Sequence, residues 1–251
     1  MITLRLAEFC RQIADDGIVQ EISERAKACA ADAFHAILLA LSSDTATLLD
    51  KYQFQRNGLC STVGRGFASA EDAALFNSSL AAVHEIDDVH YDTSLHPGAI
   101  IVPAALAASE LSGADGARRF LSAVAVGYEV AVRLSIASGY RHYHYFHSSA
   151  TCGTIGAAAA AGVAMNLSLN QMHAAIGLAA TSASGLWEGI TDQAVMVKHL
   201  HLGIAAERGG RSAHVRRQPF MGWRRLQHGR VEPPPSGRRP HSVFRYILGD
   251  R

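Results

Sequence analysis

The sequence predicts an all-α protein, and two observations support this fold class. Apolar residues recur at steps of three and four along most of the chain, the spacing of one face of an α-helix. Alanine dominates the apolar residues and aromatic residues make up only 7%, which favours closely packed helices over an aromatic-rich sandwich or barrel. With 251 residues, of which 49% are hydrophobic, the chain is long enough to bury a large core.

The first part of the chain is predicted to contain three helices. Apolar stripes indicate helices over residues 4–13 and 18–41. Residues 53–68 contain three glycines and predict a loop or short irregular connection. A further helix is predicted over residues 70–83, directly after Ser69, which is a favourable cap residue.

Further helices are predicted after a polar segment. Pro103 is predicted to open a helix that runs to about Leu111, because proline is favoured at the first helical position. A long helix follows over residues 114–136. The alanine-dense run over residues 155–165 predicts a helix that is buried on most faces. The remaining helices are predicted over residues 172–186 and 194–206.

The composition changes near the end of the last predicted helix. Residues 1–203 hold 12 basic and 19 acidic residues, a net charge of −7, whereas residues 204–251 hold 11 arginines and three acidic residues, a net charge of +8. Five of the seven prolines also lie in this last part. We therefore expect a helical domain over residues 1–206, and an irregular, Arg- and Pro-rich tail over residues 207–251 in which helical periodicity stops at about Arg208.

The segment from His84 to Gly98 is the most informative for chemistry. It places four carboxylates and three imidazoles in fifteen positions without a lysine or arginine. Groups this close shift one another's pKa values, which is how a general acid and base pair is made. Two alternatives stay open: a solvated acidic connection between helices, or a metal site, although the segment lacks the spacing that puts two imidazoles on one helix face.

Two further clusters could bind an anion. His142, His144 and His147 precede Ser148-Ser149-Ala150-Thr151, just ahead of the alanine-rich helix. Hydroxyls and free N–H groups at a helix N-terminus can bind a carboxylate, although plain capping is the alternative. Lys198 and His201, three residues apart on one helical face within apolar sequence, form the other cluster.

Other classes of function find no support in the sequence. Four scattered cysteines suggest neither a disulfide framework nor a zinc ribbon, so we expect a reduced, cytoplasmic setting. We expect no signal peptide and no membrane segment. No dinucleotide fingerprint, phosphate-binding loop or nucleophile elbow is present. The basic tail has no recognisable fold to bind nucleic acid, so we expect no such partner.

Taken together and in this order, the three clusters resemble the 2-methylcitrate dehydratase (MmgE/PrpD) family, which includes cis-aconitate decarboxylases and iminodisuccinate epimerases. The resemblance covers residues 3 to about 206. The matching stretches are Glu85-Ile86-Asp87-Asp88, His96-Pro97-Gly98, Val102-Pro103-Ala104, Gly127-Tyr128-Glu129-Val130, Phe146-His147, the 153–161 run, Ala183-Ser184-Gly185-Leu186 and 198–203.

The resemblance implies an all-α bundle that carries most of the active site, a smaller α/β lid domain, homodimers, and no metal or organic cofactor. It also implies dehydration, decarboxylation or epimerisation of a small polycarboxylate by proton transfer next to a carboxylate. By position, His96 is the implied acid or base, with Asp88 and Glu85 as its acidic neighbours. The implied substrate-binding residues are His147, Lys198, Ser149 and Thr93.

The chain departs from the family pattern at three places. It has Glu85-Ile86 where many members read Asp-Phe, and Ser148-Ser149 where Pro and Thr often follow the histidine. Family members also continue into a further helix and the lid. We therefore expect a truncated chain, and we hypothesise that residues from about Glu207 derive from a frameshift. The expected activity is 2-methylcitrate dehydratase-like; a decarboxylase, an epimerase or an inactive remnant that keeps only the fold and dimerisation are the alternatives.

Overall fold

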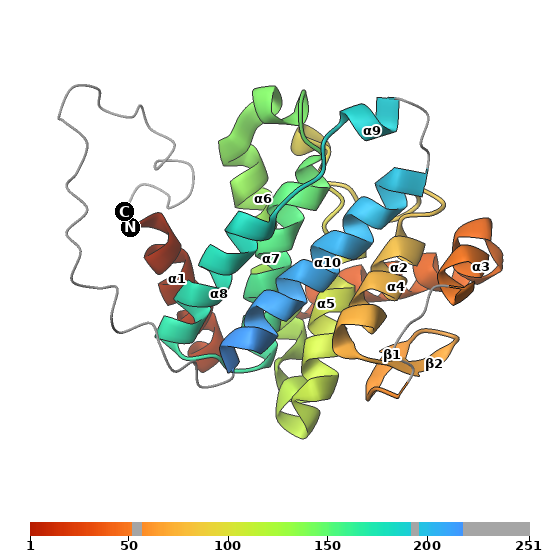
Figure 1. The fold of residues 1–251 in the computed structure, drawn as a ribbon. Coiled ribbons are helices and arrows are strands. Elements are labelled where there is room, and N and C mark those ends of the chain that lie inside the picture. Colours follow the sequence, from red (N-terminus) through yellow and green to blue (C-terminus); the bar gives the residue numbers. More distant parts are fainter. Residues whose placement is uncertain (52–56, 192–195, 218–251) are drawn as a thin grey trace.

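The protein is described by a computed structural model of residues 1–51, 57–191 and 196–217 (Figure 1). Most of the described residues lie in helices, which confirms the predicted all-α class. The only strands among them form one short hairpin, β1 (Cys60–Thr62) and β2 (Gly66–Ala68), which pair antiparallel. No α/β lid domain is present in this part of the chain.

The helices follow one another with short connections. They are α1 (Ile2–Asp16), α2 (Gln20–Leu39), η1 (Ala40–Ser42), α3 (Asp44–Lys51), α4 (Ala70–Ala81), η2 (Tyr91–Thr93), α5 (Gly98–Leu111), α6 (Gly113–Tyr143), α7 (Ser148–Ala164), α8 (Leu169–Ser182), α9 (Glu188–Thr191) and α10 (Met196–Arg217).

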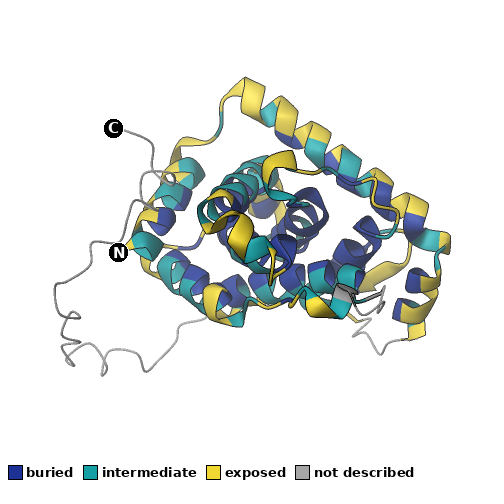
Figure 2. Ribbon diagram, turned by 90° about the horizontal axis from the view of Figure 1, so that it is seen from above, coloured by how far each residue is buried: buried dark blue, intermediate teal, exposed yellow. Residues whose placement is uncertain are grey.

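Helix α7 lies at the centre of the bundle, where α5, α6, α8 and α10 all contact it. The residues from Ala157 to Ala161 are completely buried, so the predicted core helix is confirmed. It begins at Ser148, earlier than the expected residue 155. The view from above shows the buried helices inside a ring of partly exposed ones (Figure 2). Small side chains let these helices approach closely, and their packed interior stabilises the bundle.

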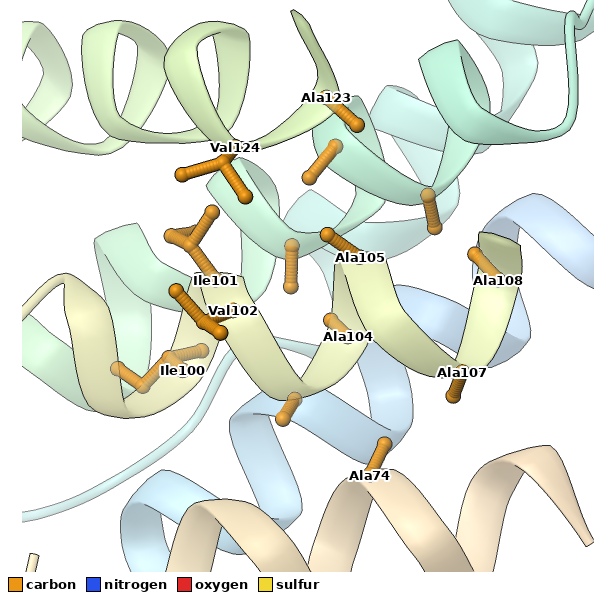
Figure 3. Packing of buried hydrophobic residues seen from close by; sticks show 14 of the residues in the cluster. Ala74, Ile100, Ile101, Val102, Ala104, Ala105, Ala107, Ala108, Ala123 and Val124 are labelled. Carbon is orange, nitrogen blue, oxygen red and sulfur yellow. The ribbon is translucent and has the colours of Figure 1, made fainter. Parts of the chain in front are cut away.

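Helix α5 crosses the core between α4 and α6. In the close-up, Ala107 of α5 and Ala74 of α4 point toward each other, while Ile101 faces Val124 of α6 (Figure 3). All four side chains are buried. Because most residues of α5 are buried, the residue just before it is held in a fixed position relative to the bundle.

Several helix boundaries differ from the sequence-based predictions. Pro103 does not open α5, which begins five residues earlier at Gly98 and contains the proline. A carboxylate caps the N–H of Gly98, so the helix can start there in spite of the later proline. The predicted loop over residues 53–68 contains the β1–β2 hairpin; its residues 53–56 lie outside the described part.

The prediction that helical structure stops at Arg208 is wrong, since α10 continues to Arg217. The reason is tertiary packing. A Cβ at Gly209 would lie 2.5 Å from the Cβ of Ala157, so the glycine lets α10 lie directly against α7. Arg208 also donates a hydrogen bond to the carbonyl of Ser182. The expected domain boundary at residues 206–207 falls within α10, and most of the expected irregular tail, residues 218–251, lies outside the described part.

Helix α6 is long and apolar enough to cross a membrane by length and composition alone. Core helices commonly meet the same test. Here α6 packs against α5 and α7, and 39% of its apolar window is buried among the described residues.

Candidate active site

The connection between α4 and α5 is a tightly folded loop. His90 and Leu95 form an antiparallel bridge around η2, and Nδ1 of His90 lies 2.9 Å from Oγ1 of Thr93. Glu85 and Ser94 adopt left-handed backbone conformations with φ of 53° and 50°. Such conformations are costly for residues other than glycine and persist only where the surroundings enforce them. The loop therefore has a specific backbone structure, while several of its side chains, such as Ile86 and Tyr91, are exposed.

The loop places His96 against Asp87. Nδ1 of His96 lies 3.1 Å from Oδ2 of Asp87, and the Asp87 side chain is 1% exposed. Since a carboxylate only accepts hydrogen bonds, Nδ1 is the protonated nitrogen. Nε2 of the neutral imidazole is then free to accept a proton, which is the orientation a general base requires.

The side chain of Asp88 points away from His96 and binds the N-terminus of α5. Its Oδ1 accepts a hydrogen bond of 2.8 Å from the N–H of Gly98, and its Oδ2 accepts one of 2.7 Å from the hydroxyl of Tyr128. Burial raises the pKa of Asp88, and the two hydrogen bonds oppose this rise. The acidic neighbour that touches His96 is thus Asp87 and not Asp88.

The start of α7 meets the same loop. The backbone N–H of His96 donates a hydrogen bond of 3.0 Å to Oγ of the fully buried Ser149. His147 immediately precedes the helix, and its own N–H donates to the carbonyl of Gly185. The hydroxyl of Ser149 therefore positions His96 instead of capping its own helix.

His147 is a buried imidazole in an electropositive environment. Its ring lies 5.0 Å from that of Trp187 and 5.8 Å from that of His201, measured between centroids. Its pKa is lowered to about 3, mainly by burial and in smaller part by the neighbouring His201, Lys198 and His96. Its Nδ1 has no hydrogen-bond partner among the described residues. The ring is neutral at physiological pH and can donate or accept one hydrogen bond.

Lys198 brings a cation to the loop from α10. Its ammonium group forms an ion pair with the carboxylate of Glu85, which is about half exposed. The connection between α4 and α5 and the N-terminal part of α10 lie at the same end of the bundle (Figure 1). Lys198 also contributes to the lowered pKa of both His147 and His199. One end of the bundle therefore combines an acid–base pair, a neutral imidazole and a cation.

Comparisons with known proteins identify the family of the chain. The MmgE/PrpD N-terminal domain matches residues 4–230. The chain belongs to the MmgE/PrpD family. It is 28% identical over 243 residues to a cis-aconitate decarboxylase-like protein, oryM, of Aspergillus oryzae, covering 90% of this chain and 48% of that protein.

Two other relatives of this MmgE/PrpD chain are cis-aconitate decarboxylases. The protein from Aspergillus terreus is 29% identical over 220 residues, covering 83% of this chain and 44% of its own length. The protein from Mus musculus is 33% identical over 144 residues, covering 51% of this chain and 27% of its own length. The chain spans about half the length of the Aspergillus relatives it matches.

The MmgE/PrpD structure brings most of the candidate residues together. His96, Ser149, His147, Lys198 and Glu85 are linked by hydrogen bonds, an ion pair or electrostatic contact. Thr93 lies in the same loop but contacts His90. Among the described residues, no group of three or more His, Cys, Asp or Glu side chains could hold a metal ion. A cavity of about 590 Å³ lies elsewhere, between α1, α2 and α6.

Sequence reasoning left three contributors out of the candidate residues. Asp87 was part of the acidic segment, yet its spacing from His96 gave no reason to prefer it over Asp88. His201 was noted only for sharing a helix face with Lys198, whereas its ring packs toward His147. Trp187, whose ring packs against His147, directly follows the matching stretch that ends at Leu186. Its position next to this stretch is the only sequence feature that could have indicated a place in the site.

Proposed function

We propose that this chain carries the acid–base site of a lyase that acts on small polycarboxylates without a metal or organic cofactor. The observation that carries the proposal is the pairing of His96 with the buried Asp87 at the end of the bundle where Lys198 supplies a cation. Removing a proton next to a carboxylate needs a base and a nearby positive charge that stabilises the developing anion.

Each group has a distinct role in the proposed reaction. Nε2 of His96 exchanges the proton with substrate carbon, and Asp87 stabilises the imidazolium that forms. The ammonium group of Lys198 binds a substrate carboxylate in place of the carboxylate of Glu85. The neutral His147 donates a hydrogen bond to a second carboxylate of the substrate. In a 2-methylcitrate dehydratase-like reaction, the C–H electron pair forms the double bond as hydroxide leaves. The leaving hydroxide then takes up a proton and departs as water.

Decarboxylation is the second candidate, and the names of the relatives favour it, since they are cis-aconitate decarboxylases. In that reaction the bond to one carboxylate breaks and CO₂ leaves. The electron pair moves through the adjacent double bond, and the distant carbon takes a proton from His96. One proton is consumed for each CO₂ released. Both reactions use the same imidazole to move a proton at carbon.

The full active site and the oligomer are also proposals, because the chain spans about half the length of its Aspergillus relatives. We propose a cytoplasmic homodimer, which light scattering would detect. A chain that forms dimers and binds polycarboxylates but turns none over would favour the alternative of an inactive remnant.

Proton NMR in heavy water tests the proposal. The purified 251-residue chain is incubated with 2-methylcitrate or cis-aconitate, without added metal or cofactor. Loss of water, release of CO₂ or deuterium exchange at carbon would identify dehydration, decarboxylation or proton transfer alone. Each signal is expected to disappear in His96→Gln. An activity that persists in this variant, or the absence of any signal with every polycarboxylate tried, would contradict the proposal.

A further inference from the structure

Asp88 ties three parts of the fold together beside the candidate site. One carboxylate oxygen binds the N–H of Gly98 at the start of α5, and the other binds the hydroxyl of Tyr128 in α6. The preceding residue, Asp87, turns toward His96 instead. The two consecutive carboxylates therefore have different partners. Asp87 contacts the candidate site, whereas Asp88 contacts the helices that support it.

The contact between these groups leaves no room for a side chain at residue 98. A Cβ at Gly98 would lie 2.5 Å from Oδ1 of Asp88 and 2.6 Å from the hydroxyl oxygen of Tyr128. Both distances are far below an ordinary carbon–oxygen contact. Glycine thus lets the Tyr128 hydroxyl and the Asp88 carboxylate close over the first turn of α5, two residues after His96.

The hydroxyl of Tyr128 has a second neighbour. The thiol of Cys29 in α2 interacts with it electrostatically, and burial, Asp88 and Cys29 together raise the pKa of Tyr128. The phenol therefore stays protonated and can donate its proton to Asp88.

We propose that Tyr128 is a positioning residue, whose hydroxyl holds Asp88 on the N-terminus of α5 and thereby sets the orientation of His96 against Asp87. The role in catalysis rests on the function proposed above, whereas the positioning itself does not. Among the described residues the hydrogen bond of the Tyr128 hydroxyl goes to Asp88, and that of the His96 ring involves Asp87, so Tyr128 acts on His96 through Asp88.

The electrostatics of Asp88 explain why the hydroxyl matters. Burial raises the pKa of Asp88, and the negative charges of Asp87 and Asp32 contribute to the same rise. The hydrogen bonds from Tyr128 and Gly98 are the opposing contributions. Without the hydroxyl, Asp88 takes up a proton at higher pH, and a neutral carboxyl binds the Gly98 N–H more weakly.

The test uses the full chain with Tyr128→Phe, which keeps the ring and removes the hydroxyl. Tyr140→Phe is the matched control, because Tyr140 lies on the same helix and is 84% exposed. NMR with carbon-13-labelled histidine follows the His96 ring, identified by its loss in His96→Gln, and amide exchange follows Gly98. In Tyr128→Phe we expect the Gly98 amide to exchange about tenfold faster and the His96 titration to shift. The control should match the wild type.

Asp88→Asn tests the hydrogen bond between Tyr128 and Asp88 by changing its acceptor. This variant provides a result if Tyr128→Phe does not fold. It should change the signal of the His96 ring in the same way as Tyr128→Phe does. An unchanged His96 titration and unchanged Gly98 exchange in the folded variants would overturn the proposal. If the chain has turnover, Tyr128→Phe should lower kcat about tenfold, change KM less than about twofold, and move the acidic limb of the pH profile upward.

The two proposals can fail separately. A wild-type chain without turnover contradicts the proposed function, yet the His96 titration and Gly98 exchange still decide whether Tyr128 positions the site. Conversely, turnover that is lost in His96→Gln but unchanged in Tyr128→Phe would support the proposed function and contradict the positioning role of Tyr128.

Discussion

Asp87 and His96 form a hydrogen-bonded pair in which the carboxylate is almost fully buried while the imidazole is partly exposed. Oδ2 of Asp87 lies 3.1 Å from Nδ1 of His96, and the side chains are 1% and 18% exposed. The other oxygen of Asp87 has no hydrogen-bond partner among the described residues. A buried carboxylate with one partner is costly. This cost is understandable if the pair sets the tautomer and basicity of His96.

Asp87→Asn should therefore impair proton transfer more than ligand binding. The amide keeps the size of the side chain but cannot stabilise an imidazolium, so we expect kcat to fall by a factor of about 10² or more. Turnover and calorimetric binding of a polycarboxylate measure the two effects. Asp92→Asn, an exposed change in the same loop, should behave like the wild type. Equal losses in both variants would contradict a specific role for Asp87.

Lys198→Ala should weaken polycarboxylate binding. A charge-assisted hydrogen bond contributes roughly 1.5–3 kcal/mol, so the Kd is expected to rise about 10- to 100-fold. Titration calorimetry with tricarballylate, a saturated tricarboxylate that cannot react by either route, measures this directly. Lys27→Ala is the control, because Lys27 lies on α2 and is 52% exposed. A Kd within twofold of the wild-type value would remove Lys198 from the binding site.

Glu85→Gln should have the opposite effect on binding. The carboxylate of Glu85 forms an ion pair with the ammonium group of Lys198. A substrate carboxylate must displace it, and this competition disappears when the charge is removed. We expect tricarballylate to bind several-fold more tightly to Glu85→Gln, with little gain at high ionic strength. Weaker binding would instead indicate that Glu85 contacts the ligand through a proton.

The helices were predictable from the sequence because their causes are local. The alanine run that forms the middle of α7 has no polar face, and only a fully enclosed helix accommodates it. Ser69 caps α4, as predicted, by accepting a hydrogen bond from the N–H of Asp72. The predicted end at about Arg208 was wrong because the packing of α10 at Gly209 against α7 is a tertiary contact, which the composition of the segment does not show.

The candidate site was predictable as a region but not as a geometry. The acidic loop, the His147 cluster and Lys198 were each recognised, and the fold brings them to one end of the bundle. Which carboxylate meets His96 depends on a loop with left-handed residues at Glu85 and Ser94. These conformations are not favoured by the residues themselves and arise from tertiary constraints, so the choice between Asp87 and Asp88 could not be read from the sequence.

His147 should make the stability of the protein depend on pH. Burial lowers its folded-state pKa to about 3 from an ordinary value of 6.5. Between these values the unfolded chain binds a proton that the folded chain does not, so stability is lost as the pH falls. From pH 7 to pH 5 the wild type should lose about 2 kcal/mol more than His147→Gln in urea denaturation. His35→Gln, an exposed change, should keep the wild-type dependence.

Gly127→Ala should destabilise the centre of the bundle. A Cβ at this position would lie 2.4 Å from Cγ2 of Ile101 and 2.9 Å from the Cβ of Ala160, so α5 and α7 would both have to move. Overpacking of this kind costs about 1–3 kcal/mol. Gly177→Ala is the matched control, because a Cβ there meets nothing within 4 Å and alanine favours the helix. Urea denaturation should therefore show lower stability for Gly127→Ala and equal or higher stability for Gly177→Ala. If Gly127→Ala matched the wild type, the close approach of α6 to α5 and α7 would not be a constraint, and the rigid support for the residues before α5 would have to come from elsewhere.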